Sequence, residues 1–212
     1  MNIIINISGV YEEESWIPEE SITVNLRSLE GCCCYCEKDA EEAIRRAIMP
    51  YQASGLHWID TGDYHYISKL WMEKIQEPFV LALFDNHPDD QSSAFGNLLS
   101  CGSWVQVARA GLTMMKADYL NPEEIPEKLP VYLSIDMDIM PRQFARTNWD
   151  QGEMTPDMLL SAIDNFAAGH RIIGIDICGG LSIAKGAVAE DLAVNVKTRN
   201  LLSEHLSRLP SL

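Results

Sequence analysis

Short apolar segments alternate with amphipathic segments along most of the chain, and this alternation constrains the fold more than any other feature. Residues 79–85 and 131–136 are nearly continuous apolar runs, which is typical of strands buried on both faces of a sheet. Residues 37–49 instead place Ala40, Ile44 and Ile48 on one helical face before Pro50. Strands alternating with helices predict a parallel sheet that is covered on both faces.

The remaining segments continue this pattern. Further strands are predicted at residues 2–8, 56–60 and 171–177, and further helices at residues 66–76, 104–110, 155–168 and 187–209. Residues 121–130 contain three prolines and are predicted to form a loop. A length of 212 residues fits one domain, so we predict a single α/β domain over residues 1–212, a three-layer α/β/α sandwich with a mostly parallel sheet.

The charge of the chain excludes two classes of partner. The formal net charge is −15, and such a surface repels nucleic-acid phosphates and anionic lipid headgroups. No apolar run approaches the ~18 residues that a membrane-spanning helix needs. The first residues lack the basic segment of a signal peptide, so we expect a cytoplasmic protein that binds neither nucleic acid nor membranes.

Six cysteines are present, and four of them lie within residues 32–36. A zinc ribbon requires a second pair of cysteines at a suitable spacing, and the sequence has none. We therefore expect reduced thiols in a turn before a helix, with a redox or metal role as the alternative.

Polar side chains follow three of the predicted strands. Asp85, His87 and Asp89 occupy alternate positions after the strand at 79–85, so an extended backbone would aim them to one side. Asp136 and Asp138 follow the strand at 131–136 in the same way. In parallel sheets the carboxyl ends of the strands form the ligand-binding edge.

Two neighbouring acids beside a buried strand repel each other and lose hydration, and a cation between Asp136 and Asp138 would relieve both effects. His65 follows the strand at 56–60 and adds an imidazole to the set. The alternatives are a polar turn, an exposed strand end and a helix cap. Six possible ligands are enough for two metal ions when carboxylates bridge them.

The three motifs together resemble those of a known family. Gly-Asp-x-His at residues 62–65, Asp-x-His-x-Asp at 85–89 and Ser-x-Asp-x-Asp at 134–138 are similar to those of the arginase, agmatinase and formimidoylglutamase family, the ureohydrolases. Residues 144–155 and 175–177 extend the resemblance, which covers residues 56–180. It implies an arginase/deacetylase-like fold. It also implies a binuclear manganese site, with zinc or iron as alternative metals. The implied ligands are His65, Asp85, His87, Asp89, Asp136 and Asp138. Of these, Asp85 and Asp136 are the implied bridging carboxylates.

The sequence departs from the family at two positions. Arginases carry a glutamate shortly after the aspartate of the last strand, whereas residues 176–180 here read Asp-Ile-Cys-Gly-Gly. Family members also carry a histidine before a glycine in the loop after the first Asp-rich motif, where this chain has Ser100 and Cys101. The resemblance therefore implies the metal site but not specificity for arginine or agmatine.

The resemblance implies hydrolysis of a linear carbon–nitrogen bond in a small molecule with a guanidine, amidine or amide group. The expected catalytic residues are Asp89 as the proton carrier, together with His65 and Cys101. The expected substrate contacts are Asn148, Trp149 and Asp150, unless this loop only packs before the following helix. The family also favours a homo-oligomer.

Two other functions compete with this one. The chain could hold its metal ions for a structural or regulatory purpose without turnover, as the missing glutamate and histidine suggest. It could also be a single-zinc, deacetylase-like amidohydrolase with Asp85, His87 and Asp136 as ligands, but the sequence has no pair of adjacent histidines.

Overall fold

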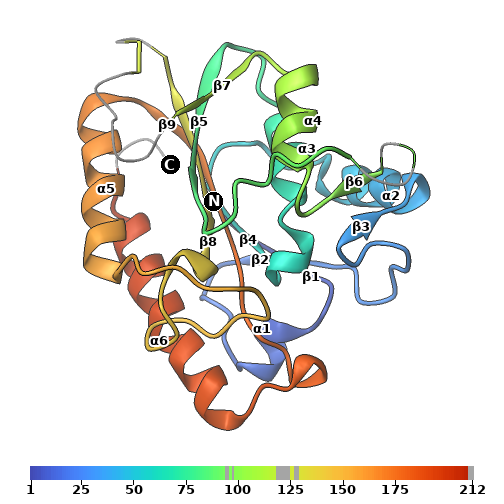
Figure 1. Cartoon of the computed structure of the whole chain (residues 1–212), viewed down its shortest axis with the longest axis vertical. Helices are drawn as coiled ribbons and strands as arrows, with labels where there is room; N and C mark the ends of the chain where they lie inside the picture. Colours follow the sequence, from blue (N-terminus) through green and yellow to red (C-terminus); the bar gives the residue numbers. More distant parts are fainter. Residues whose placement is uncertain (94–95, 97, 118–124, 127–128, 210–212) are drawn as a thin grey trace.

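A seven-stranded sheet in the order β2-β1-β4-β9-β8-β5-β7 forms the centre of the molecule (Figure 1). The computed structural model describes residues 1–93, 96, 98–117, 125–126 and 129–209. Every strand pair of this sheet within those residues is parallel. Its strands are β1 (Asn2–Asn6), β2 (Ile22–Asn25), β4 (Leu56–Ile59), β5 (Phe79–Phe84), β7 (Met114–Ala117), β8 (Val131–Asp136) and β9 (Ile172–Cys178).

Helices connect the strands, and a small antiparallel pair lies apart from the main sheet. That pair consists of β3 (Tyr35–Cys36) and β6 (Leu99–Ser100). The α-helices of the described residues are α1 (Val10–Glu13), α2 (Lys38–Ile48), α3 (Ile67–Met72), α4 (Trp104–Gly111), α5 (Pro156–Gly169) and α6 (Ala189–Leu206). The same residues include the short 3-10 helices η1 (Gly62–Tyr64), η3 (Met137–Ile139) and η4 (Ile183–Lys185).

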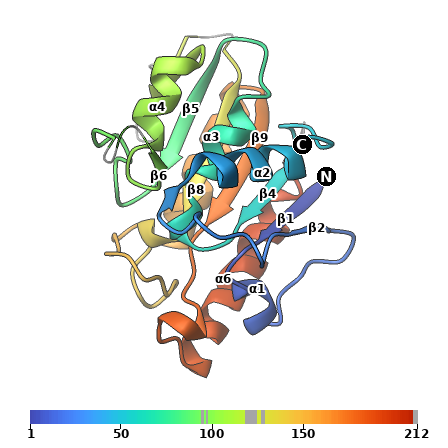
Figure 2. The ribbon, with the colours of Figure 1, turned by 90° about the vertical axis from the view of Figure 1, so that its right-hand side faces the viewer.

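Two apolar cores lie on opposite faces of the sheet. Helices α2, α3 and α4 contribute to one core and α1, α5 and α6 to the other. Figure 2 is viewed from the side of α2 and α3, and α6 lies behind the sheet. Strand β5 supplies both cores from alternate positions, for example Leu81 to the first and Ala82 to the second. The predicted three-layer α/β/α sandwich is therefore confirmed.

The predicted elements agree with the structure except at some ends. The strand at 131–136 matches β8, and the helix expected from residue 155 begins with Thr155, whose hydroxyl accepts a hydrogen bond from the Met158 amide at 3.3 Å. Helix α3 stops at Met72 instead of residue 76, because the chain continues in tighter turns, such as Ile75 N to Met72 O at 3.0 Å.

Several strands were not expected from the sequence, namely β2, β3, β6 and β7. Strand β2 is an edge strand in which only Val24 is buried, so it lacks a recognisable apolar pattern. Most of the loop expected at residues 121–130 lies outside the described residues. Within the described chain, no helix combines the length and the apolar character needed to cross a membrane.

Buried Arg199 ties the last helix to Glu14 at the end of α1 and to the loop that follows β9. Arg199 on α6 bonds Glu14 Oε2 through Nε at 2.6 Å, and it donates to the Gly179 carbonyl through a terminal nitrogen at 2.6 Å. Its guanidinium also lies over the ring of Tyr11, at 4.7 Å from the ring centroid. Because Gly179 begins a turn with positive φ directly after β9, this pair fixes the chain next to the polar edge of the sheet.

Replacing Arg199 by Met should leave the Glu14 carboxylate buried without its partner. We expect Arg199→Met to lower the free energy of unfolding by about 3–5 kcal/mol, measured by urea denaturation at neutral pH. The double variant Glu14→Gln, Arg199→Met should recover part of this loss, since it removes both charges. A loss below about 1 kcal/mol in the single variant, as for a solvated pair, would contradict the buried role.

Candidate metal centre

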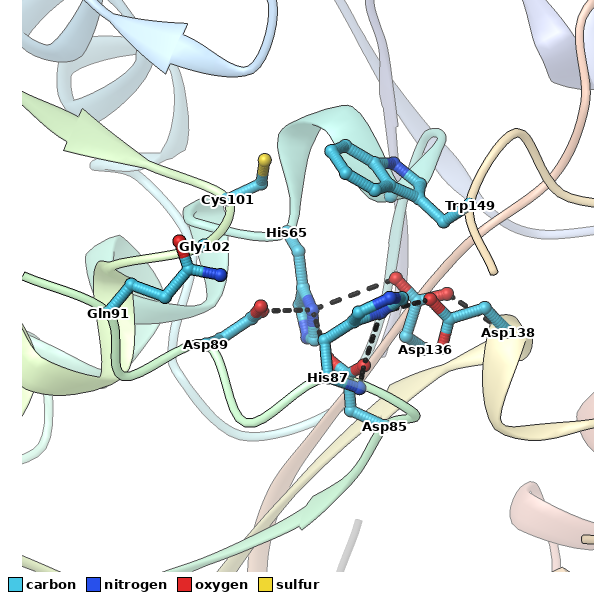
Figure 3. A pocket seen from close by; sticks show the side chains of 11 residues that line it. His65, Asp85, His87, Asp89, Gln91, Cys101, Gly102, Asp136, Asp138 and Trp149 are labelled. Atoms are coloured by element: carbon cyan, nitrogen blue, oxygen red, sulfur yellow. Dashed lines mark hydrogen bonds and ion pairs between the residues drawn. The ribbon is translucent and has the colours of Figure 1, made fainter. Parts of the chain in front are cut away.

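All six predicted ligands line one small cavity at the carboxyl edge of the sheet (Figure 3). His65 follows η1 beyond β4, the Asp-rich segment from Asp85 follows β5, and Asp136 ends β8. The cavity has a volume of about 50 Å³, which is room for a few water molecules or ions. The other residues that line it are Gly62, Gln91, Cys101, Gly102 and Trp149.

The ligands form two groups that share Asp85. In the first group, His65 Nδ1 lies 3.0 Å from Asp85 Oδ2 and 3.1 Å from Asp89 Oδ2. Asp136 Oδ2 lies 3.7 Å from the same nitrogen. In the second group, His87 Nδ1 lies 2.9 Å from Asp138 Oδ2 and 3.5 Å from Asp85 Oδ1. Asp85 thus presents one oxygen to each group, which is the arrangement of a bridging carboxylate.

The orientation of His65 is fixed from behind by two strands. Its Nε2 lies 2.9 Å from Ser134 Oγ, and Ser134 donates to Asp176 Oδ1 at 2.6 Å. Because the serine proton is used toward Asp176, we assign the His65 proton to Nε2, which donates to Ser134. The lone pair of Nδ1 then faces the carboxylates. A histidine that donates its far nitrogen to such a partner is typical of a metal ligand.

The surroundings of His65 Nδ1 indicate whether these residues could hold a metal ion. It is fully buried and, among the described residues, has no hydrogen-bond partner, although two carboxylates lie about 3 Å away. A buried nitrogen without a directed bond costs free energy. A divalent cation at this point would satisfy the lone pair and the carboxylates together, so the residues fit a metal centre.

The carboxylates disturb one another's ionisation. Burial, with Asp136 and Asp85 nearby, raises the pKa of Asp138 to about 10. Burial also raises the pKa of Asp136, and it raises the pKa of Asp89 to about 6 with help from Asp85. Asp85 differs, because the neighbouring His65 and His87, including the hydrogen bond from the His87 backbone amide, outweigh burial and lower its pKa. With the pKa of Asp138 at about 10, this cluster holds a proton at neutral pH.

His65 provides a counter-charge to these carboxylates. Burial acts to lower its pKa, but Cys178, Asp85 and Asp89 outweigh burial and raise the pKa above the ordinary value. A cation bound among the carboxylates would take over this role and leave Nδ1 neutral as a ligand.

Further hydrogen bonds hold each carboxylate in place. Trp104 Nε1 donates to Asp89 Oδ2 at 2.6 Å, the Asn86 amide donates to Asp138 Oδ1 at 3.1 Å, and the Asp138 amide donates to Asp136 Oδ1 at 3.0 Å. Asp89 itself has a φ of 48°, a left-handed conformation that is costly outside glycine.

The predicted catalytic and substrate residues fall in different places. Cys101 lines the cavity, and burial followed by Asp89 and Asp63 raises the pKa of its thiol to about 12. Trp149 also lines the cavity and is partly exposed. Asn148 and Asp150 do not line it: Asn148 donates to Asp63 Oδ1 at 3.0 Å, and the Asp150 carbonyl accepts from Asn86 at 3.1 Å.

Several contributors were not found from the sequence. Gln91 lines the cavity, and Trp104, Ser134 and Asp176 support the ligands. Cys178 donates a hydrogen bond from Sγ to Asp136 Oδ2 at 3.1 Å. The sequence offered one signal for Cys178. Side chains alternate between the two faces of a strand, so residues 176 and 178 point to the same face of β9. The structure also places Asp85, His87 and Asp138 close enough to hold one ion. The deacetylase alternative named Asp136 in place of Asp138.

Metal binding should release protons, because ligation requires a carboxylate and Asp138 is protonated at pH 7.5. Near pH 6, Asp89 adds a second site of protonation, so metal affinity should fall as the pH falls from 8 to 5. Calorimetry with Mn²⁺ in buffers of different ionisation enthalpy measures the protons released. Heats that do not depend on the buffer would contradict the assigned protonation.

Comparisons with known proteins address the fold. No protein-family model matches the chain. An uncharacterised protein of Thermotoga maritima is 28% identical over 195 residues, which cover 83% of this chain and 78% of that protein. Formimidoylglutamase from Bacillus subtilis has a TM-score of 0.61 at 12% identity, with 98% of this chain and 87% of that chain covered.

Two further solved structures are similar. Arginase from Medicago truncatula has a TM-score of 0.61 at 14% identity, with 97% of this chain and 86% of that chain covered. A triple mutant of the T. brucei arginase-like protein, bound with Mn²⁺, has a TM-score of 0.53 at 13% identity, with coverage of 98% and 90%. The resemblance seen in the sequence motifs is thus confirmed at the level of the fold: the chain has the fold shared by arginase and formimidoylglutamase.

Proposed function

We propose that the chain is a hydrolase of the arginase–agmatinase type that uses two divalent metal ions to cleave a linear carbon–nitrogen bond. The observation that carries this proposal is the pair of ligand groups that share Asp85, with the unpartnered Nδ1 of His65 facing the carboxylates. The substrate class is a small molecule with a guanidine, amidine or amide group.

Two metal positions follow from the grouping. One ion would be held by His65, Asp85 and Asp89 with Asp136, and the other by Asp85, His87 and Asp138. Four carboxylates and two imidazoles suit manganese, with zinc and iron as alternatives. The Mn²⁺-bound T. brucei arginase-like protein, which shares the fold, supports manganese as the first choice.

The metal ions, when bound, would lower the pKa of a water molecule and polarise the planar carbon that it attacks. The residues of the chain would then carry out the remaining steps. Asp89, oriented by Trp104, would take a proton from the attacking water and pass it to the leaving nitrogen. His65 would stay fixed by Ser134, and its role is to hold the metal.

The two sides of the cavity would select the substrate. Trp149 lies on one side, with its indole Nε1 held by Asp63 Oδ1 at 3.2 Å, and Cys101 lies on the other side. No acidic side chain follows Asp176 on β9, because the chain turns there through Gly179 and Gly180. A guanidinium group would therefore lack the partner that arginases provide, which favours substrates other than arginine.

A second candidate function is metal binding without turnover. The observation in its favour is Cys101, whose thiol stands where the family carries a histidine. Because its pKa is about 12, this thiol stays protonated at neutral pH and cannot shuttle protons as a histidine does.

The proposal is tested by loading the full chain with Mn²⁺ and screening guanidine, amidine and amide compounds for release of urea or ammonia. We expect turnover of at least one compound. The Asp136→Ala, Asp138→Ala double variant should lose about 1,000-fold in kcat/KM, the equivalent of several kcal/mol of transition-state stabilisation. Tight metal binding with no product from any compound would favour the second candidate, and failure to bind metal would reject both.

Trp149 is predicted to contact the substrate from the side of the cavity. We expect Trp149→Ala to raise KM about tenfold with little change in kcat, since it removes apolar contact rather than a reacting group. Met158→Ala is a matched control, because Met158 is an exposed apolar residue on α5 outside the cavity. An unchanged KM in Trp149→Ala would remove this residue from the substrate site.

A further inference from the structure

Cys178 is a buried thiol beside the proposed metal centre, and the proposed mechanism does not use it. It is the last residue of β9 and is fully buried. Its register partner on β8 is Asp136, just as Ser134 is the partner of Asp176 two positions earlier. Neighbouring residues in register on parallel strands point to the same face, so the thiol and the Asp136 carboxylate lie side by side.

The thiol contacts the atoms that would hold the first ion. Its Sγ lies 3.1 Å from Asp136 Oδ2 and also interacts with the imidazole of His65. One ligand atom each from His65, Asp136 and Cys178 lie within 4.8 Å of one another. The His65 atom facing this group is Nδ1, the buried nitrogen without a hydrogen-bond partner.

These separations are those of ligands around one ion. Metal–sulfur and metal–nitrogen or –oxygen bonds of roughly 2.3 and 2.1 Å place two ligand atoms on one ion about 3–4 Å apart. The distance from Sγ to Asp136 Oδ2 falls in this range. Hydrogen bonds to the next residue, Gly179, also fix the position of the thiol. Arg199 donates to the Gly179 carbonyl, and the Gly179 amide donates to the Asp60 carbonyl.

We propose that Cys178 is a further ligand of the first metal ion, beside His65 and Asp136, and that its sulfur shifts this position toward softer ions such as zinc, cobalt or iron(II). The inference rests on the metal centre of the proposed function. On binding, the S–H bond breaks, the proton leaves to solvent and a sulfur–metal bond forms, with no change of oxidation state. Thiolate ligands favour zinc and iron over manganese, unlike a set of carboxylates and imidazoles alone.

The test uses the full chain loaded with Co²⁺ and followed by absorption spectroscopy. A thiolate bound to cobalt gives an intense charge-transfer band in the near ultraviolet, in addition to the weaker visible bands of the metal. We expect this band in the parent and its loss in Cys178→Ser, with the visible bands retained. Cys101→Ser is the matched control, because Cys101 also lies at the cavity, and it should keep the band.

Four results would overturn the inference. If the parent binds cobalt but shows no charge-transfer band, the metal centre is supported and Cys178 is not one of its ligands. A band that survives in Cys178→Ser, or disappears in Cys101→Ser, would assign the sulfur elsewhere. Failure of the parent to bind cobalt would reject the inference together with the proposed function.

Metal competition and NMR give independent measurements. Cys178→Ser should lower the affinity for Zn²⁺ about tenfold or more and change the affinity for Mn²⁺ less. Equal losses for both ions would indicate that the thiol only orients Asp136. If Cys178→Ser does not fold, cadmium NMR of the parent decides the matter, since a thiolate ligand moves the cadmium resonance strongly downfield and its absence leaves the resonance in the oxygen–nitrogen range.

Discussion

The mutual repulsion of four carboxylates at one edge of the sheet is the constraint on which the site depends. Asp85, Asp89, Asp136 and Asp138 surround one small cavity, and all are almost completely buried. Their charges cannot all be present together without compensation: burial, followed by the neighbouring carboxylates, raises the pKa of both Asp138 and Asp136. A pair of cations would resolve this conflict, and among the described residues histidine is the only basic side chain that lines the cavity.

The fold holds these groups together despite their repulsion. Parallel strands end at one edge, so residues far apart in the sequence meet there. Behind them, Ser134 and Asp176 orient His65, and the Arg199–Glu14 pair fixes the turn after β9. The site is thus built on strand ends with buried support, which keeps the candidate ligands in a fixed geometry.

Much of this arrangement could be predicted from the sequence, because strands such as β5 and β8 are continuous apolar runs and their polar ends are conspicuous. The ligand set followed from those ends together with the family resemblance. Edge strand β2 could not be predicted, since only Val24 on it is buried. Gln91 and Cys178 were also missed. Gln91 lies in a loop, and the contact of Cys178 with Asp136 depends on β8 and β9 becoming neighbours, which is not encoded locally. Cys101 and Trp149 reach the cavity as expected, whereas Asn148 and Asp150 are turned to other partners.

The most direct test of the central claim is the metal content of the full chain, reloaded with Mn²⁺ and measured by inductively coupled plasma mass spectrometry. The account predicts about two ions per chain. It further predicts that Asp85→Ala loses both, because this carboxylate faces both ligand groups. A parent chain without tightly bound metal, or an Asp85→Ala variant that keeps its full content, would contradict the account.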